Sequence, residues 1–142
     1  MSLRPVLLGS ILCLLAGCGQ EQQIYDNPHL ITDRDSLGFG LEYNSGAFVG
    51  TEVSDTLRID NRGSQNLVIS SVELTGDAVF RKDNVTSTTI APLKYAFQVV
   101  YFKPTKVTSS EADDFKGQLV IHSNSETDPD KVITLRGRGV KP

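Results

Sequence analysis

The sequence is poor in cysteine, with two among its 142 residues, and both lie within the first 18 positions. Beyond Cys18 the chain has no thiol, so no disulfide can form within that part, and the cysteine ligands of structural zinc sites are missing. Tryptophan is absent altogether. A domain built from these residues must therefore be stabilised by its apolar core.

An excess of basic residues is missing as well. Lysine and arginine number 14 against 17 aspartates and glutamates, which gives a formal net charge of −3. Proteins that bind nucleic acid concentrate Lys and Arg, so we expect no nucleic-acid partner. Glycine-rich phosphate-binding motifs and the H-E-x-x-H zinc motif are also absent. We therefore expect no enzyme activity and no cofactor.

Long apolar runs are lacking too, apart from one near the start. Residues 6–16 are almost wholly apolar, but this run is shorter than the roughly 20 residues that a membrane-spanning helix needs. A positive charge at Arg4 precedes the run and small residues end it, which is typical of a secretory signal peptide. We therefore predict a signal peptide over residues 1–17.

The end of this run resembles the lipobox of bacterial lipoprotein precursors in Leu15, Ala16, Gly17 and Cys18. The resemblance implies diacylglycerol on the Cys18 sulfur, cleavage before it and acylation of the freed amine. Two or more acyl chains would hold the protein firmly, at ~0.8 kcal/mol per buried methylene. The alternative is an ordinary signal peptide whose cleavage site falls near a cysteine. By analogy, Gly19 in place of an Asp favours the outer membrane of the cell envelope.

The chain that remains is long enough for one domain. Removing residues 1–17 leaves 125 residues, and the loss of Arg4 changes the net charge from −3 to −4. Residues 18–36 are polar with scattered apolar positions, which predicts a lipidated cysteine followed by an extended, weakly structured tether. The domain itself is predicted over residues 37–142.

From Leu37 onward, polar and apolar residues alternate with a period of two, as in residues 56–60, where Leu57 and Ile59 share one face. Short alternating stretches between turn residues, without helical periodicity, are typical of a β-sandwich. Seven strands are predicted, near residues 37–41, 51–60, 66–75, 78–90 in part, 94–103, 115–123 and 131–140. The predicted fold is an all-β, seven-stranded, antiparallel immunoglobulin-like (Ig-like) sandwich.

One strand lacks this clean alternation. Residues 95–102, YAFQVVYF, are apolar at both odd and even positions. A strand buried on both faces has this pattern, and so does a strand that carries a bulge. The sequence leaves open which set of side chains faces the core.

Several stretches, in order, resemble the ASH (hydin-like) family, whose bacterial relatives include choice-of-anchor D domains. They are TLRIDNRG (56–63), LTGDAVF (74–80), VYFKPT (100–105), GQLVIHSN (117–124) and LRGRGV (135–140), with shorter matches at 39–40, 49–50, 67, 69 and 90–92. The resemblance implies a non-catalytic Ig-like module. Eukaryotic members are docking units in ciliary and centrosomal proteins, whereas bacterial members occur in envelope and surface proteins.

Two segments depart from the family pattern by their length, residues 41–48 and 105–116. Loops on a rigid scaffold commonly carry function, so any individual function is expected there. Tyr43 and Phe48 in the first segment are candidate binding residues. With Tyr95 they would also line the aromatic pocket that a glycan or small ligand would need.

Two acidic clusters and two histidines complete the candidates for chemistry. The clusters are Glu111, Asp113 and Asp114 before the sixth predicted strand, and Glu126, Asp128 and Asp130 after it. Seven strand residues separate them by about 20 Å, so they cannot share an ion. The second cluster is a weak candidate for calcium, and otherwise a solvated turn. His29 falls in the tether, and His122 alternates with Leu119 and Ile121, so we expect it to face solvent with no carboxylate beside it.

Together these features predict a protein held to the membrane through lipid on Cys18 that binds or supports other envelope proteins. Contact through a sheet face or strand addition at a sheet edge would serve this role. The alternative is an envelope protein that binds a glycan or small ligand, with or without calcium.

Overall fold

The computed structural model describes residues 23–41 and 47–142; the predicted signal peptide, Cys18 and Tyr43 lie outside the described residues. Every regular element in the described part is a β-strand, and no helix there could cross a membrane. The strands are β1 (Leu30–Thr32), β2 (Ser36–Phe39), β3 (Ala47–Phe48), β4 (Val53–Asn61), β5 (Leu67–Gly76), β6 (Phe80–Lys82), β7 (Thr89–Ile90), β8 (Tyr95–Phe102), β9 (Phe115–Ser123), β10 (Asp130–Gly137) and β11 (Gly139–Val140). The predicted all-β class is confirmed.

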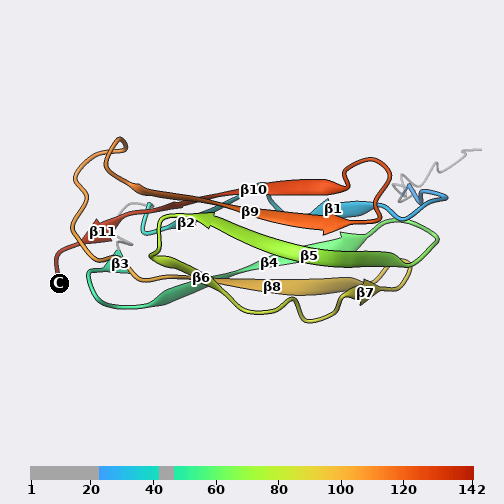
Figure 1. Cartoon of the computed structure of the whole chain (residues 1–142), viewed down its shortest axis with the longest axis horizontal. Coiled ribbons are helices and arrows are strands. Elements are labelled where there is room, and N and C mark those ends of the chain that lie inside the picture. Colours follow the sequence, from blue (N-terminus) through green and yellow to red (C-terminus); the bar gives the residue numbers. More distant parts are fainter. Residues whose placement is uncertain (1–22, 42–46) are drawn as a thin grey trace, which may run out of the picture.

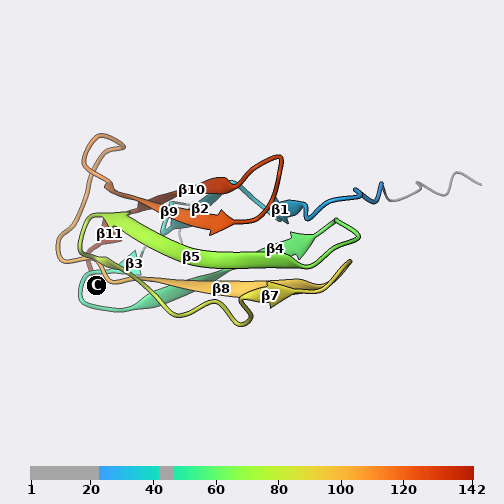
Figure 2. The same ribbon diagram turned by 45° about the vertical axis from the view of Figure 1, so that its right-hand side comes forward.

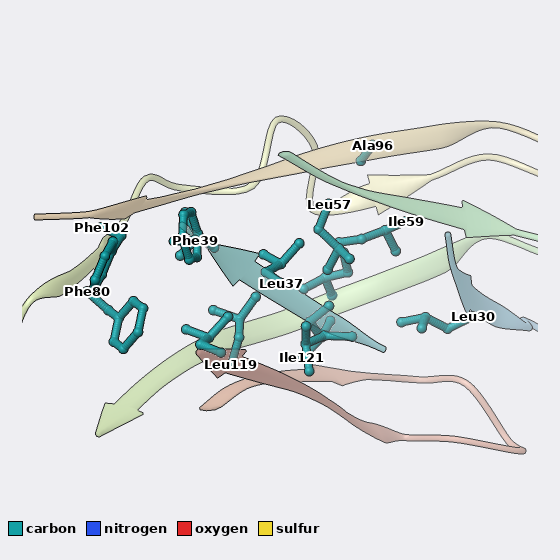
Figure 3. Close-up of a cluster of buried hydrophobic side chains, with 14 of the residues drawn as sticks. Leu30, Leu37, Phe39, Leu57, Ile59, Phe80, Ala96, Phe102, Leu119 and Ile121 are labelled. Atoms are coloured by element: carbon teal, nitrogen blue, oxygen red, sulfur yellow. The ribbon is translucent and has the colours of Figure 1, made fainter. Parts of the chain in front are cut away.

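Two sheets face each other along the length of the molecule (Figures 1 and 2). One has the strand order β1-β4-β8-β6 and the other β2-β10-β9-β5-β7, while β11 and β3 form a small pair at one end. The alternation predicted for the long strands is present, since Leu57 and Ile59 of β4 and Leu119 and Ile121 of β9 are fully buried between the sheets (Figure 3).

The sandwich is not wholly antiparallel, which corrects the prediction. Strand β2 runs parallel to β10, and β3 runs parallel to β11. Residues 33–35 carry the chain directly from β1 in one sheet to β2 in the other. The side-chain period is two in both parallel and antiparallel strands, so alternation in the sequence does not distinguish them.

The predicted tether is wrong for much of the described N-terminal segment. Residues 30–32 form β1, which pairs with the end of β4, and Leu30 is buried in the core. Before β1, the Tyr25 amide donates to the Arg62 carbonyl at 3.0 Å, and a Cβ on Gly63 would lie 2.0 Å from the Asn27 carbonyl oxygen. A three-residue strand is too short to show a period, so its apolar positions look scattered in the sequence.

Strand β8 alternates regularly, so neither predicted explanation of its apolar sequence is correct. Ala96, Gln98, Val100 and Phe102 are buried, whereas the odd-numbered side chains face outward. Buried Gln98 keeps its amide nitrogen satisfied by donating to the Asp83 and Val99 carbonyls. The bulge lies instead in β5, between Ile69 and Ser71.

An aromatic cluster fills one end of the core. The ring of Phe102 lies 5.5 Å from that of Phe39 and 5.2 Å from that of Phe80, measured between centroids (Figure 3). The ring of Phe115 lies 5.7 Å from Phe102. Gly137 lies against the same ring: a Cβ there would be 2.4 Å from Cε2 and Cζ of Phe102. This position therefore requires glycine because the ring already fills the space.

Gly137→Ala should destabilise the domain by about 1–3 kcal/mol, because Phe102 must move within a packed core to admit the methyl group. Gly38→Ala is the matched control, since its new methyl would meet the flexible end of Leu41 at 3.2 Å. Urea unfolding of both variants measures the difference. Equal midpoints would show that Phe102 can move freely.

Candidate functional site

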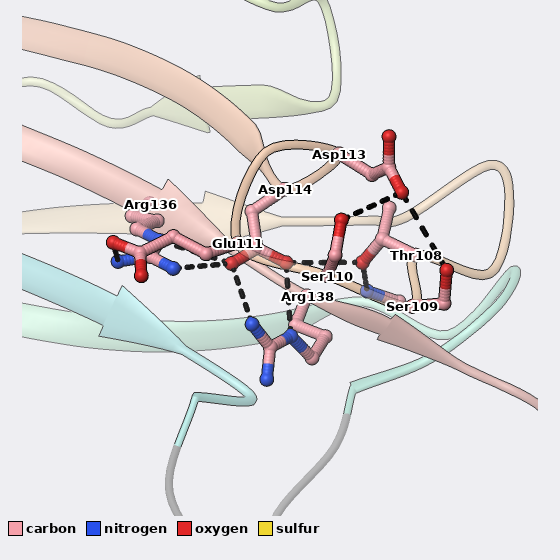
Figure 4. A network of polar contacts seen from close by, with 9 residues as sticks. Thr108, Ser109, Ser110, Glu111, Asp113, Asp114, Arg136 and Arg138 are labelled. Atoms are coloured by element: carbon pink, nitrogen blue, oxygen red, sulfur yellow. Dashed lines mark hydrogen bonds and ion pairs between the residues drawn. The ribbon is translucent and has the colours of Figure 1, made fainter.

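The 105–116 segment is anchored by a buried carboxylate. The side chain of Asp114 is 0% exposed and accepts hydrogen bonds from Nε and Nη2 of Arg136 and of Arg138, all at 2.7–2.9 Å (Figure 4). The Thr108 hydroxyl adds a contact at 3.2 Å and accepts in turn from the Gly139 amide, also at 3.2 Å. The Asp114 network, these four residues and Gly139, thus connects the segment to β10 and β11.

The two arginines keep Asp114 ionised. Hydrogen bonds from Arg138 and then from Arg136 lower the pKa of Asp114 to about 2, although burial alone would raise it. A carboxylate with so low a pKa is a poor proton donor or acceptor near neutral pH. The predicted acidic cluster is also divided, because Glu111 pairs with Arg136 at 2.8 Å and Asp113 accepts from Ser110 at 2.9 Å.

The second acidic cluster does not assemble a calcium site. Glu126 accepts from Asn27 at 2.6 Å, Asp128 lies 3.6 Å from the Lys131 ammonium, and Asp130 lies 2.6 Å from Nδ1 of His122. Each carboxylate therefore has a different partner. Over the described ranges, no group of three or more His, Cys, Asp or Glu side chains is placed to hold a metal.

His122 faces outward as predicted, but the prediction that no carboxylate lies beside it is wrong. Its Nδ1 lies 2.6 Å from Asp130 Oδ1, and its Nε2 lies 3.7 Å from Glu73 Oε1. The hydrogen bond with Asp130 is the main cause that raises the pKa of His122, with the negative charges nearby adding to it. A catalytic base needs a free Nε2 beside a nucleophile, whereas here a second carboxylate occupies that side.

The outer face of the four-stranded sheet carries aromatic rings and arginines. Tyr95 and Phe97 are 51% and 38% exposed, and their rings meet edge to face at 5.3 Å. The guanidinium of Arg58 lies 4.2 Å from the Tyr95 ring, and that of Arg81 lies 3.7 Å from the Tyr101 ring. We call these five residues the aromatic–arginine face. The sequence did not reveal it, because the pattern of β8 left the outward side chains undecided.

Carboxylates hold both arginines of this face in place. Arg58 pairs with Asp60 at 2.6 Å, and Arg81 pairs with Glu52 at 2.9 Å and with Asp83 at 3.1 Å. The bond to Glu52 is the main cause that raises the pKa of Arg81. Exposed pairs of this kind add little stability, but they fix long side chains in one geometry.

A shallow groove of about 480 Å³ crosses the outer face of the other sheet, over β5, β9 and β10. Thr75, Gln118 and Thr134 lie directly opposite one another in the strand register and form part of its floor. Glu111 lines one side, where it pairs with Arg136. Among the described residues, the groove is lined by polar groups and by no aromatic ring.

Two of the aromatic residues predicted to line a ligand pocket, Phe48 and Tyr95, do not come together, and Tyr43 lies outside the described residues. Phe48 is half-exposed on β3, just before β4 begins at Val53. Val53 lies opposite Phe102, the last residue of β8, whereas Tyr95 is the first residue of β8. Phe48 and Tyr95 therefore lie at opposite ends of the sandwich.

The stability of the domain should fall in acid because of Asp114. Its folded-state pKa of about 2 is below the ordinary 3.8, so its stabilising effect is present above about pH 4 and is lost toward pH 2. This loss corresponds to about 2 kcal/mol. Asp114→Asn should cost about 3 kcal/mol at pH 7 and flatten the acid dependence, because Arg138 loses its carboxylate partner and Arg136 keeps only Glu111.

Urea unfolding at pH 7, 4 and 2.5 measures this dependence. Asp113→Asn is the matched control, because Asp113 is exposed and contacts only serine hydroxyls of its own loop among the described side chains. An unchanged acid dependence in Asp114→Asn would contradict the assigned role of this carboxylate.

Comparison with known proteins supports the fold. No family model and no curated protein matches the sequence. A human CEP192 ASH/PapD-like domain (PapD-like domain 7) is similar in structure, with a TM-score of 0.60 and 12% identity over 97% of this chain and 99% of that domain. A Porphyromonas gingivalis protein of unknown function has a TM-score of 0.61 and 15% identity over 82% of this chain, which spans about half (49%) of that protein. The chain therefore has an Ig-type fold like that of ASH/PapD-like domains.

Proposed function

We propose that this protein is a lipid-anchored component of the cell envelope, at the outer membrane, whose non-catalytic Ig-like domain binds other envelope proteins. The short apolar leader followed by Leu15, Ala16, Gly17 and Cys18 supports the anchor. Once residues 1–17 with Cys13 are removed, Cys18 is the single thiol that remains, and it would carry the lipid rather than form a disulfide.

The observation that carries the docking role is the aromatic–arginine face. Tyrosine and arginine are enriched among the residues that dominate binding energy in protein interfaces. Here carboxylates hold the two arginines against the tyrosine rings, so a partner would order few additional side chains. Sheet-face contact is therefore favoured over strand addition.

Binding of a glycan or small ligand is the second candidate, and the groove over β5, β9 and β10 favours it. Its floor presents two hydroxyl groups and an amide to an incoming ligand. The proposed calcium assistance has no support in the separate pairings of Glu126, Asp128 and Asp130.

The anchor is tested by growing cells with radiolabelled palmitate. The purified protein should carry label and begin at Cys18, and Cys18→Ser should carry none and leave the membrane fraction. An unlabelled wild-type protein that still contains residues 1–17 would contradict the anchor.

Docking through the aromatic–arginine face is tested with a photo-reactive amino acid at position 97 in intact cells, with position 132 as the control. The native side chains, Phe97 and Val132, are partly exposed, at 38% and 45%, but they belong to opposite sheets. A defined protein should cross-link at position 97 only, and Arg81→Ala should weaken that product several-fold. Equal products at both positions, or none, together with a melting-temperature rise on adding glycans, would favour the second candidate.

A further inference from the structure

The N-terminal segment reaches the domain at one end of the sandwich, which we call the arm end. There the Tyr25 carbonyl accepts from the Ser64 amide at 2.8 Å, and the Leu30 amide donates to Ser125 Oγ at 3.1 Å. His29 stacks on Tyr25 at 3.6 Å. The C-terminus lies at the opposite end of the molecule (Figures 1 and 2).

Leu93 at the arm end combines a strained backbone with an exposed apolar side chain. It has a φ of 60°, a left-handed conformation in which a bulky residue is strained, and its side chain is 51% exposed. It is the third residue of a turn closed by the Lys94 amide donating to the Ala91 carbonyl at 3.1 Å. Turns with positive φ at this position favour Gly or Asn. Leucine therefore departs from the usual residue preference of this turn position.

A second exposed aliphatic residue lies at the same end. Ile24 is 53% exposed and directly precedes Tyr25, whose amide donates to Arg62. The amide of Leu93 donates to the Asn61 carbonyl at 3.0 Å. Leu93 and Tyr25 are therefore hydrogen-bonded to neighbouring residues of the chain, Asn61 and Arg62. Exposed Lys94 follows Leu93 in the turn. Aliphatic side chains next to a lysine are what the boundary between lipid headgroups and acyl chains accommodates.

The length of chain between Cys18 and the arm end determines how far the arm end can lie from a membrane that holds the lipid. Only residues 19–23 separate Cys18 from Ile24, and an extended chain advances at most ~3.6 Å per residue. With its lipid in a bilayer, Cys18 would therefore hold Ile24 within about 20 Å of the membrane surface. A bilayer that holds the lipid is therefore always close to the arm end.

We propose that the arm end rests on the lipid surface, with Ile24 and Leu93 entering the headgroup region. This inference rests on the proposed lipid on Cys18. Acidic Asp26, Glu126 and Asp128 also lie near this end, so apolar contact, rather than charge attraction, drives the association. The strands then stand away from the membrane, and both sheet faces stay open to partners.

The test uses the lipidated full chain in phosphatidylethanolamine and phosphatidylglycerol vesicles that contain lipids spin-labelled near the headgroup. A fluorophore is attached at Ala91→Cys in the exposed turn, or at Val107→Cys, whose native side chain is 54% exposed in the 105–116 segment. The spin label should quench fluorescence several-fold at position 91 and leave position 107 unchanged. Flotation of the same vesicles reports the anchor separately.

Leu93→Asn and Ile24→Ser should each reduce the quenching at position 91, whereas Phe48→Ser at the opposite end should not. Asn tolerates positive φ, so Leu93→Asn should keep or raise the melting temperature. Protein that floats without quenching at position 91, or quenching unchanged in both variants, overturns the membrane contact and leaves the anchor intact. A chain that carries no lipid and does not float overturns both.

Discussion

The ion pairs between Asp114 and the two arginines that flank Gly137 connect the outer segments to the core. Arg136 and Arg138 are two residues apart in an extended chain, so their side chains leave it on the same side and both reach Asp114. Gly137 faces the other side and lies against Phe102. Residues 136–138 therefore bind the 105–116 segment on one side of the chain and pack against the aromatic cluster of the core on the other. Strand β3 pairs with β11 directly beyond them, so its position depends on the same arrangement.

Carboxylates also hold arginines in place on the aromatic–arginine face, where the arginine side chains are more exposed than Asp114. Asp60 holds Arg58 over Tyr95, and Glu52 with Asp83 holds Arg81 over Tyr101. The two Arg81 pairs are exposed on both sides and contribute little to the free energy of unfolding. The effect of these carboxylates is to reduce the number of conformations available to each arginine. The Asp114 pairs thus contribute to stability, whereas the pairs on the aromatic–arginine face hold its arginines in position, which the proposed docking role would use.

The sequence predicted what depends on local pattern and missed what depends on register. The long strands β4, β9 and β10 were found because their alternation extends over eight or nine residues. Strand β1, with three residues, and the parallel pairing of β2 left no such signal. The pairing of His122 with Asp130 could have been found, because the two lie directly opposite each other in the β9–β10 hairpin. The contact between His122 and Glu73 could not, since it requires knowing that β5 lies beside β9.

The docked N-terminal segment changes what a lipid on Cys18 would do. A flexible tether over residues 18–36 would let the domain rotate freely at a distance from the bilayer. The contacts of Tyr25, His29 and Leu30 instead attach the chain firmly to one end of the sandwich and leave residues 19–23 as the connection. So short a connection restricts rotation, because the arm end cannot move more than about 20 Å from the surface. Lipid attachment at Cys18 would therefore give the domain a preferred orientation, with its strands directed away from the membrane and the aromatic–arginine face exposed along its side.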